Sequence, residues 1–176
     1  MSREHYLIDG YNLLHAHPTL SIQLERDIDT ARTQLVAELA GFAQGGPRTI
    51  VVFDGAGNPA SDGAPHHIGA LTVIFSAAGT SADAVIEGLA RRFRDRGEAV
   101  VVVTSDAATR DTVQTGSVTV RSSAAFAVEL LSGNVEQQAE SLRHSKRVPL
   151  GERIDEQVGA TLARWARADA IESVND

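Results

Sequence analysis

The sequence contains no cysteine, which excludes disulfide bonds and thiolate metal sites and is compatible with a reducing compartment. It also has no apolar run long enough to span a bilayer. The first residues, Met1 to His5, lead directly into a predicted strand and do not have the form of a signal peptide. We therefore expect a cytoplasmic protein with no membrane partner.

Positive charge is scarce as well. The 176 residues have a formal net charge of -7, and Lys146 is the only lysine. A general nucleic-acid coating protein would be basic overall, although a bound cation or a local basic patch can still attract a phosphate backbone. The prevalence of arginine suits bidentate phosphate contacts, but a GC-rich genome is the simpler explanation.

The order of apolar patterns predicts an α/β protein. Short apolar runs predict strands at 6–8, 49–53, 71–75, 99–103 and 118–120. Apolar residues at helical spacing predict helices over 24–42, around 85–93, over 107–114 and from residue 123 onward. This alternation predicts a three-layer α/β/α sandwich with a mostly parallel central sheet. Residues 55–69, rich in glycine, proline and alanine, predict a long mobile loop.

The sequence suggests one compact domain over 1–131 and a C-terminal extension over 132–176, where strand signals stop. The extension contains a basic cluster from Arg143 to Arg147. It also contains an apolar stripe at helical spacing, formed by Leu150, Ile154, Val158, Leu162 and Trp165. This helical tail could pack on its own domain or on a second copy, so a homodimer through the C-terminal helix is one expectation.

Four carboxylates occupy comparable places in this pattern. Asp9 follows the first strand, Asp54 the second, and Asp106 the run 99–103, while Asp83 begins a predicted helix. The carboxyl ends of parallel strands meet at one edge of a sheet, so these acids should lie together. They would repel one another strongly unless a cation joined them. Hard oxygen ligands without histidine or cysteine favour Mg²⁺ or Mn²⁺.

Each acid also has a purely structural interpretation. Asp9 could form a turn with Gly10, and Asp54 could likewise be a turn residue. Asp106 could be the N-cap of the next helix.

The acids of the helix over 85–93 have similar alternatives. In Thr80-Ser81-Ala82-Asp83, Asp83 could complete a capping box whose N-cap is Thr80. Glu87 lies beside Asp83 on a helical wheel but could instead pair with Arg91.

Four blocks, in order, resemble the YacP-like branch of the NYN domains, which belong to the PIN-like nuclease superfamily. These blocks are Tyr6 to Asn12, Val52 to Asp54, Ser81 to Glu87 and Val103 to Asp106, and the resemblance covers roughly Tyr6 to Leu131. It implies a PIN-like fold and metal-dependent endoribonuclease activity. The chain departs from the family pattern at Ser81, where threonine is usual, at Arg110, where glutamine is expected, and at Gly116-Ser117, which replaces a Gly-Ala pair.

The resemblance also implies roles for single residues. Asp9, Asp83 and Asp106 would be the core catalytic acids and metal ligands, Asp54 and Glu87 supporting acids, and Asn12 would orient the site. Local charge suggests the residues that contact RNA, which are Arg94, Arg110, Arg143, Lys146 and Arg147.

The expected reaction is hydrolysis of an RNA phosphodiester bond by a water activated on Mg²⁺ or Mn²⁺. No covalent nucleophile with an adjacent base is evident, so the products should carry 5′-phosphate and 3′-hydroxyl ends. RNA, either alone or held within a larger ribonucleoprotein, is the expected partner. The main alternative is a catalytically inactive RNA-binding adaptor on the same fold.

Other classes fit less well. A haloacid-type phosphatase needs an aspartate where Tyr11 stands, and a receiver-type domain needs a lysine late in the sheet. No Gly-x-Gly-x-x-Gly follows the first strand, which argues against a Rossmann domain. An interaction protein that uses its final helix as a partner surface remains a further alternative.

Overall fold

The computed structural model describes residues 4–55, 61–113 and 116–144, with side chains described as far as residue 133. At its centre is a six-stranded sheet in the order β3-β4-β2-β1-β5-β6. Neighbouring strands are parallel except for β3, which is antiparallel to β4. The strands are β1 (His5–Asp9), β2 (Arg48–Phe53), β3 (Pro65–Ile68), β4 (Leu71–Phe75), β5 (Val100–Val103) and β6 (Val118–Arg121).

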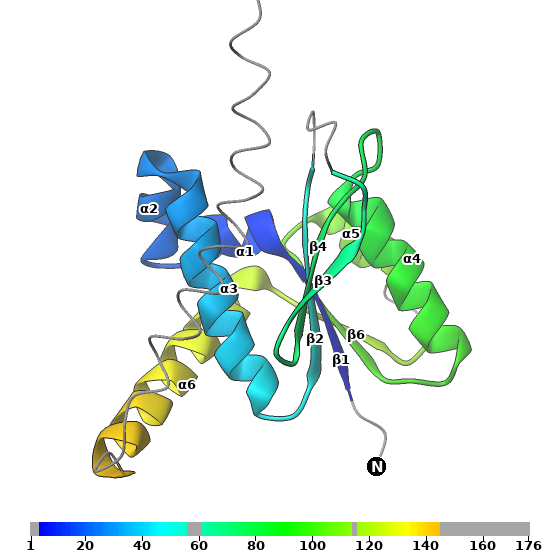
Figure 1. The fold of residues 1–176 in the computed structure, drawn as a ribbon. Helices are drawn as coiled ribbons and strands as arrows, with labels where there is room; N and C mark the ends of the chain where they lie inside the picture. The colour runs from blue at the N-terminus through cyan, green and yellow to red at the C-terminus, as the bar shows by residue number, and fades with distance from the viewer. Residues whose placement is uncertain (1–3, 56–60, 114–115, 145–176) are drawn as a thin grey trace, which may run out of the picture.

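Helices cover both faces of this sheet, which confirms the predicted three-layer sandwich (Figure 1). One face packs against α1, α2, α3 and α6, and the other against α4 and α5. The helices are α1 (Gly10–Ala16), α2 (Leu20–Arg26), α3 (Ile28–Gln44), α4 (Ala82–Asp95), α5 (Ala107–Val113) and α6 (Ser123–His144).

The central strands are buried on both faces, as unbroken apolar runs in a parallel sheet should be. Side chains alternate between the two cores because successive residues of a strand point to opposite faces. In β1, Ile8 faces the α3 side and Leu7 the α4 side; in β5, Val103 and Val102 do the same. The run 99–103 was predicted as a strand, and the resulting β5 lies between β1 and β6.

The predicted helix over 24–42 is wrong as a single element. The chain forms α2 and α3 with a break at Asp27, whose extended backbone ends one helix and begins the next. The Asp27 carboxylate accepts hydrogen bonds from the amides of Asp29 and Thr30, so it caps α3. Local capping therefore overrides an apolar spacing that continues through the break.

The predicted loop over 55–69 contains a strand. Pro65–Ile68 pairs with β4 through a tight turn at Gly69, which has a positive φ. Proline is tolerated here because it begins an edge strand. As a result β4 lies inside the sheet, between β3 and β2.

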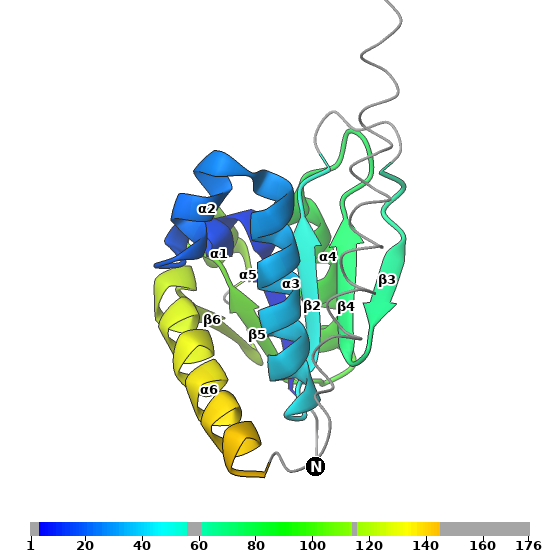
Figure 2. The same ribbon diagram turned by 60° about the vertical axis from the view of Figure 1, so that its left-hand side comes forward.

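Helix α6 continues past Leu131 to His144 and so crosses the predicted domain boundary (Figure 2). The division into 1–131 and 132–176 stays a prediction. Only the backbone of Arg143 is described, while Lys146, Arg147 and the apolar stripe lie outside the described residues. None of the helices described is both long and apolar enough to cross a membrane.

Candidate active site

The predicted acids gather at the carboxyl edge of the sheet. Asp9 is the last residue of β1, Asp54 directly follows β2, and Asp106 lies three residues after β5. In register, Asp9 pairs with Val52 and Ile8 with Val103, so the three strands end at nearly the same level. Figure 2 shows the parallel strands pointing toward the end of the molecule where α1 lies.

Asp9 is held in place by Asn12. The Asn12 backbone amide donates to Asp9 Oδ1 at 2.9 Å, and its side-chain Nδ2 donates to Oδ2 at 2.7 Å. Asp9 is 5% exposed and caps α1, which begins at Gly10, so the turn interpretation of Asp9-Gly10 is wrong. Burial raises the pKa of Asp9, the bonds to Asn12 oppose this rise, and the nearby charge of Asp83 adds to it.

Aromatic packing supports this end of β1. A Cβ added at Gly10 would lie 2.4 Å from Phe53 Cε1, so only glycine lets the Phe53 ring approach the start of α1. Tyr11 packs edge-on against Phe53, and its hydroxyl accepts a hydrogen bond from Arg32 Nη1 at 3.4 Å. The Arg32 guanidinium also lies 5.7 Å from the centre of the Phe75 ring. Burial raises the pKa of Tyr11, and the Arg32 charge opposes the rise.

Asp83 and Asp106 meet at a third residue, Thr109. The Thr109 hydroxyl oxygen lies 2.8 Å from Asp83 Oδ1 and 3.0 Å from Asp106 Oδ2. The Thr109 backbone amide donates to Asp106 Oδ2 at 2.8 Å. These bonds lower the pKa of Asp106, with the amide bond the largest cause. Thus Asp106 does cap α5, as its structural interpretation predicted, and it also lies beside Asp83.

The capping box predicted with Thr80 as N-cap does not form. Ser81 is the N-cap of α4, because its hydroxyl accepts from the Ala84 amide at 3.2 Å. Asp83 is therefore in the first turn without closing the box. Its carboxylate instead turns to α5, where it contacts Thr109.

Asp54 and Glu87 lie at the margins of this group. The Ser76 hydroxyl lies 3.5 Å from Asp54 Oδ1, and the Asp54 charge also raises the pKa of Tyr11. Glu87 lines a groove between α4 and α5 together with Arg91 and Arg94. Within the described parts of the chain, no ion pair joins Glu87 to Arg91, so their expected pairing is not formed.

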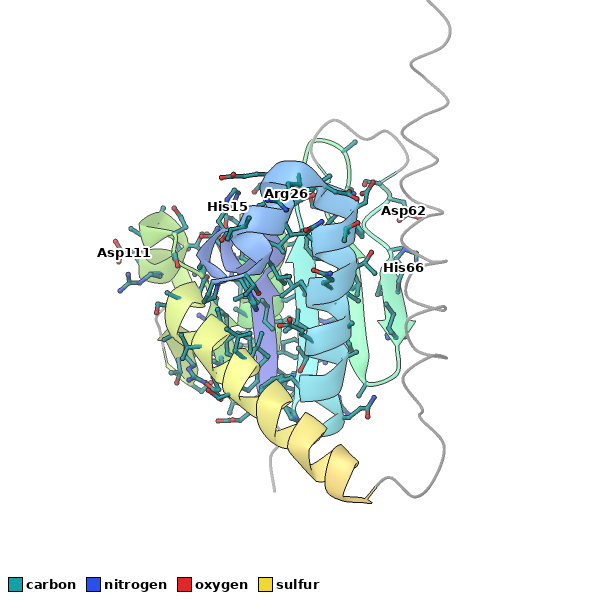
Figure 3. All side chains as sticks on the ribbon, turned by 90° about the vertical axis from the view of Figure 1, so that its left-hand side faces the viewer. His15, Arg26, Asp62, His66 and Asp111 are labelled. Atoms are coloured by element: carbon teal, nitrogen blue, oxygen red, sulfur yellow. The ribbon has the colours of Figure 1, made fainter. Side chains whose placement is uncertain are left out.

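The expected RNA-contact residues lie in three places. Arg94 lines the groove between α4 and α5 and pairs with Asp95 at 3.3 Å. Arg110 is exposed on α5. The side chains of Arg143, Lys146 and Arg147 fall outside the description. Figure 3 shows Asp111 on α5 and His66 on β3 at opposite sides of the molecule.

The donor chemistry at this edge fits a hard divalent ion, because carboxylate oxygens are its preferred ligands. The charge of Asp83 contributes to the raised pKa of Asp9, and Asp83 is linked through Thr109 to Asp106. The three acids therefore form a continuous series. Among the residues described, however, no three acidic or histidine side chains converge closely enough to hold an ion as they stand. Convergence on one ion needs side-chain rotation, so the metal-ligand assignment stays a prediction.

Two residues at this edge were not predicted from the sequence. Thr109 is 2% exposed, although its side chain is polar. Arg32 is largely buried beneath Tyr11, and among the described residues its Nε has no hydrogen-bond partner. Asp106 and Thr109 are spaced as an N-cap and its N3 residue, which was a usable signal for Thr109. For Arg32, nothing in the sequence distinguishes it from the exposed arginines.

An α/β/α sandwich that collects acids at the carboxyl ends of its parallel strands defines a class of protein with a PIN-like fold. Residues 6–167 match the YacP-like NYN domain family, and the chain belongs to this family. The match extends into the C-terminal extension, beyond the four blocks recognised in the sequence. Membership places the chain among the PIN-like nuclease relatives and suggests a ribonuclease type of function.

Individual relatives agree with this membership. The chain is 29% identical over 170 residues to the protein YacP of Bacillus subtilis (strain 168), covering 93% of this chain and 96% of YacP. A crystal structure of Rae1 (YacP) from Bacillus subtilis superposes with a TM-score of 0.63 at 27% identity, covering 96% and 97% of the two chains. A point mutant of Rae1 gives a TM-score of 0.65 at 24% identity, covering 95% and 99%.

Proposed function

We propose that the protein is a metal-dependent endoribonuclease that hydrolyses RNA phosphodiester bonds to leave 5′-phosphate and 3′-hydroxyl ends. One observation carries the proposal: in a member of the YacP-like NYN family, Asp9, Asp83 and Asp106 form a continuous series at the carboxyl edge of the sheet. Such an arrangement of carboxylates is costly without a cation, which supports a role in metal-assisted chemistry.

Asp9, Asp83 and Asp106 would hold Mg²⁺ or Mn²⁺. Such an ion, when bound, supplies an activated water and neutralises charge that develops on the phosphate. The chain's own part is to hold the acids. Asn12 fixes the orientation of Asp9 through two hydrogen bonds, and burial raises the pKa of Asp9, which an adjacent cation would offset. Asp54 and Glu87 are proposed as supporting acids at either side.

The RNA strand is proposed to run from the acids along the groove between α4 and α5. Glu87 lies one helical turn beyond Asp83, and Arg94 lines the same groove two turns farther on. A guanidinium in that position suits a phosphate oxygen. Exposed Arg110 and the basic residues Arg143, Lys146 and Arg147 are proposed as further phosphate contacts.

Replacement of Asp9 by asparagine tests the activity. The Asp9→Asn variant retains an acceptor for Asn12 but loses the charge, so cleavage of a labelled RNA in Mg²⁺ should fall by about 100-fold or more. End-group analysis of the wild-type products should find 5′-phosphates. Asp111→Asn is the matched control, because Asp111 is an exposed acid on α5 (Figure 3). This variant should cleave RNA like the wild type. Undiminished cleavage by Asp9→Asn would overturn the assignment.

The inactive adaptor remains the alternative, and a Mg²⁺ titration separates the two. An enzyme whose acids bind the ion should unfold at a higher temperature as Mg²⁺ rises, because an ion that binds the folded state stabilises it. An adaptor should bind RNA with no such shift and no cleavage.

A larger ribonucleoprotein is proposed as the setting of the RNA, and a homodimer through the C-terminal helix is proposed from the sequence of the extension alone. Light scattering on the purified chain checks the dimer: the dimer proposal expects twice the 18.7 kDa chain mass. The Leu162→Glu variant, which places a charge in the apolar stripe, should then return the mass to one chain. A wild-type monomer would reject the dimer.

A further inference from the structure

Thr109 occupies an unusual position between two of the proposed metal ligands. Asp83 belongs to α4 and Asp106 precedes α5, and both carboxylates contact the same hydroxyl group. The two carboxylate oxygens can therefore be no farther apart than these two bonds laid end to end. Thr109 itself is buried, at 2% exposure, so water does not replace its contacts.

A threonine hydroxyl has one proton, so it can donate to only one of these carboxylates at a time. Asp106 Oδ2 already accepts the Thr109 backbone amide at 2.8 Å. The hydroxyl therefore donates to Asp83 Oδ1, the nearer oxygen at 2.8 Å. Thr109 thus uses two different donors for two acids: the amide orients Asp106 and the hydroxyl orients Asp83.

This division of donors leaves one oxygen of Asp83 available to bind a cation. Asp83 Oδ2 has no hydrogen-bond partner among the described residues, and it belongs to the carboxylate whose charge Asp9 senses. A carboxylate fixed by one oxygen presents the other in a limited range of directions. Loss of the hydroxyl would release Asp83 but leave the cap of α5 intact, because the cap uses the backbone amide.

We propose that Thr109 is a positioning residue, whose hydroxyl holds Asp83 at the spacing from Asp106 that one divalent cation requires. The inference rests on the proposed function, because it assigns both acids to a cation site. Thr109 does not need to touch the ion or the RNA. Groups that orient metal ligands in this way typically contribute 10–100-fold to metal affinity or activity.

Thr109→Val is the variant that tests the hydroxyl, because valine has the same shape and keeps the backbone amide. The readout is Mn²⁺ binding to the full chain by isothermal calorimetry, without RNA. The affinity should fall about tenfold or more. Thr109→Ser restores the hydroxyl and should bind within about twofold of the wild type. The Mg²⁺ concentration needed for half-maximal RNA cleavage should rise in parallel.

Thr119→Val is the matched control, because it removes an exposed hydroxyl on β6 and should bind Mn²⁺ like the wild type. Circular dichroism checks that each variant is folded. If Thr109→Val does not fold, Thr109→Ala also removes the hydroxyl and keeps the amide. A folded Thr109→Val or Thr109→Ala variant with wild-type Mn²⁺ affinity would overturn the inference, even if it were less stable.

The same measurements separate this failure from failure of the proposed function. Wild-type protein that binds Mn²⁺ and cleaves RNA, beside an equally competent Thr109→Val variant, rejects the role of Thr109 and leaves the nuclease assignment standing. Wild-type protein that neither binds Mn²⁺ nor cleaves RNA rejects the proposed function, and the inference about Thr109 falls with it.

Discussion

At the scale of single residues, Asp9 and Asp106 respond in opposite ways to their surroundings. Asp9 is buried beside another acid, so its pKa is raised, whereas Asp106 accepts the Thr109 backbone amide, so its pKa is lowered. Charge on Asp9 therefore destabilises the folded chain, and charge on Asp106 stabilises it. A site that tolerates one unfavourable charge is consistent with selection for binding a cation and not for stability.

The first prediction concerns the pH dependence of stability without metal. The folded protein binds the Asp9 proton more tightly than the unfolded chain does. The contribution of Asp9 to the free energy of unfolding therefore falls as pH rises from the ordinary carboxyl pKa through the raised pKa of Asp9. Relative to the wild type in EDTA, Asp9→Asn should gain stability as pH rises from the ordinary carboxyl pKa through the raised pKa of Asp9, on top of a pH-independent loss because its amide offers Asn12 one acceptor in place of two. Urea unfolding at several pH values measures this.

Asp106→Asn supplies the comparison of opposite sign. The stabilisation from ionised Asp106 is complete above the ordinary carboxyl pKa and is lost as pH falls through its lowered pKa. This variant should therefore be less stable than the wild type at pH 7, and the difference should shrink in acid. Equal shifts of both variants in one direction would contradict the assigned environments.

The second prediction concerns Gly10. A methyl group there would overlap the Phe53 ring, with a Cβ only 2.4 Å from Phe53 Cε1. Gly10→Ala should reduce the free energy of unfolding by about 1–3 kcal/mol, the usual effect of overpacking. Gly88→Ala is the matched control at an exposed position of α4, where nothing lies within 4 Å of an added Cβ. That variant should gain about 0.5–1 kcal/mol, and a Gly10→Ala variant of wild-type stability would contradict the packing.

At the scale of elements, the N-terminus of α2 is capped by a side chain that lies outside the helix. Thr19, the N-cap residue, makes no side-chain capping bond. His17 Nδ1 takes that role, accepting from the Leu20 amide at 3.2 Å, while Nε2 lies 3.1 Å from Glu38 Oε2 on α3. The imidazole is fully buried, so this one ring joins the end of α1, the start of α2 and the side of α3.

The third prediction follows from this contact. His17→Ala removes the cap and leaves Glu38 without its ring partner, so the free energy of unfolding should fall by about 1–3 kcal/mol. His15→Ala is the control, because His15 is exposed on α1 (Figure 3) and should change stability by less than about 0.5 kcal/mol. Similar urea midpoints for the two variants would show that His17 does not support α2.

Elements were predictable where periodicity or burial dominates. The buried run of β5 and the strongly amphipathic α4 were expected from their patterns. The break at Asp27 was not, because the apolar spacing continues across it and a capping bond decides the end of the helix. Strand β3 was missed because its pairing with β4 is a tertiary contact, and a short segment containing proline has no strand pattern of its own.

At the scale of the whole molecule, a net charge of -7 must be reconciled with the proposed polyanionic substrate. A chain with this net charge does not attract RNA over long range, so the proposed function requires local arginine and lysine contacts for binding. The cluster containing Arg143, Lys146 and Arg147 has no acidic residue within it, and it follows the predicted acids in the chain.

The fourth prediction is the salt dependence of RNA binding. Each phosphate contact contributes about -0.7 to the slope of log affinity against log salt for a single strand. Replacing Lys146 and Arg147 by glutamine should therefore flatten the slope by about 1.4 if both contact phosphates. Arg48→Gln is the control, because Arg48 begins β2 at the opposite end of the strand from Asp54. An unchanged slope in the double variant would remove the cluster from the RNA path.

The sequence by itself determined the family, the three-layer architecture and the positions of the central strands along the chain. These depend on apolar periodicity and on short motifs that lie within a few residues. It also indicated that Asp9, Asp54 and Asp106 share one edge, since parallel strands end together. Only the tertiary structure decided which groups touch. The contact of Asp83 with Thr109, 26 residues away, joins two helices whose relative placement depends on packing against the sheet. No local pattern encodes that distance.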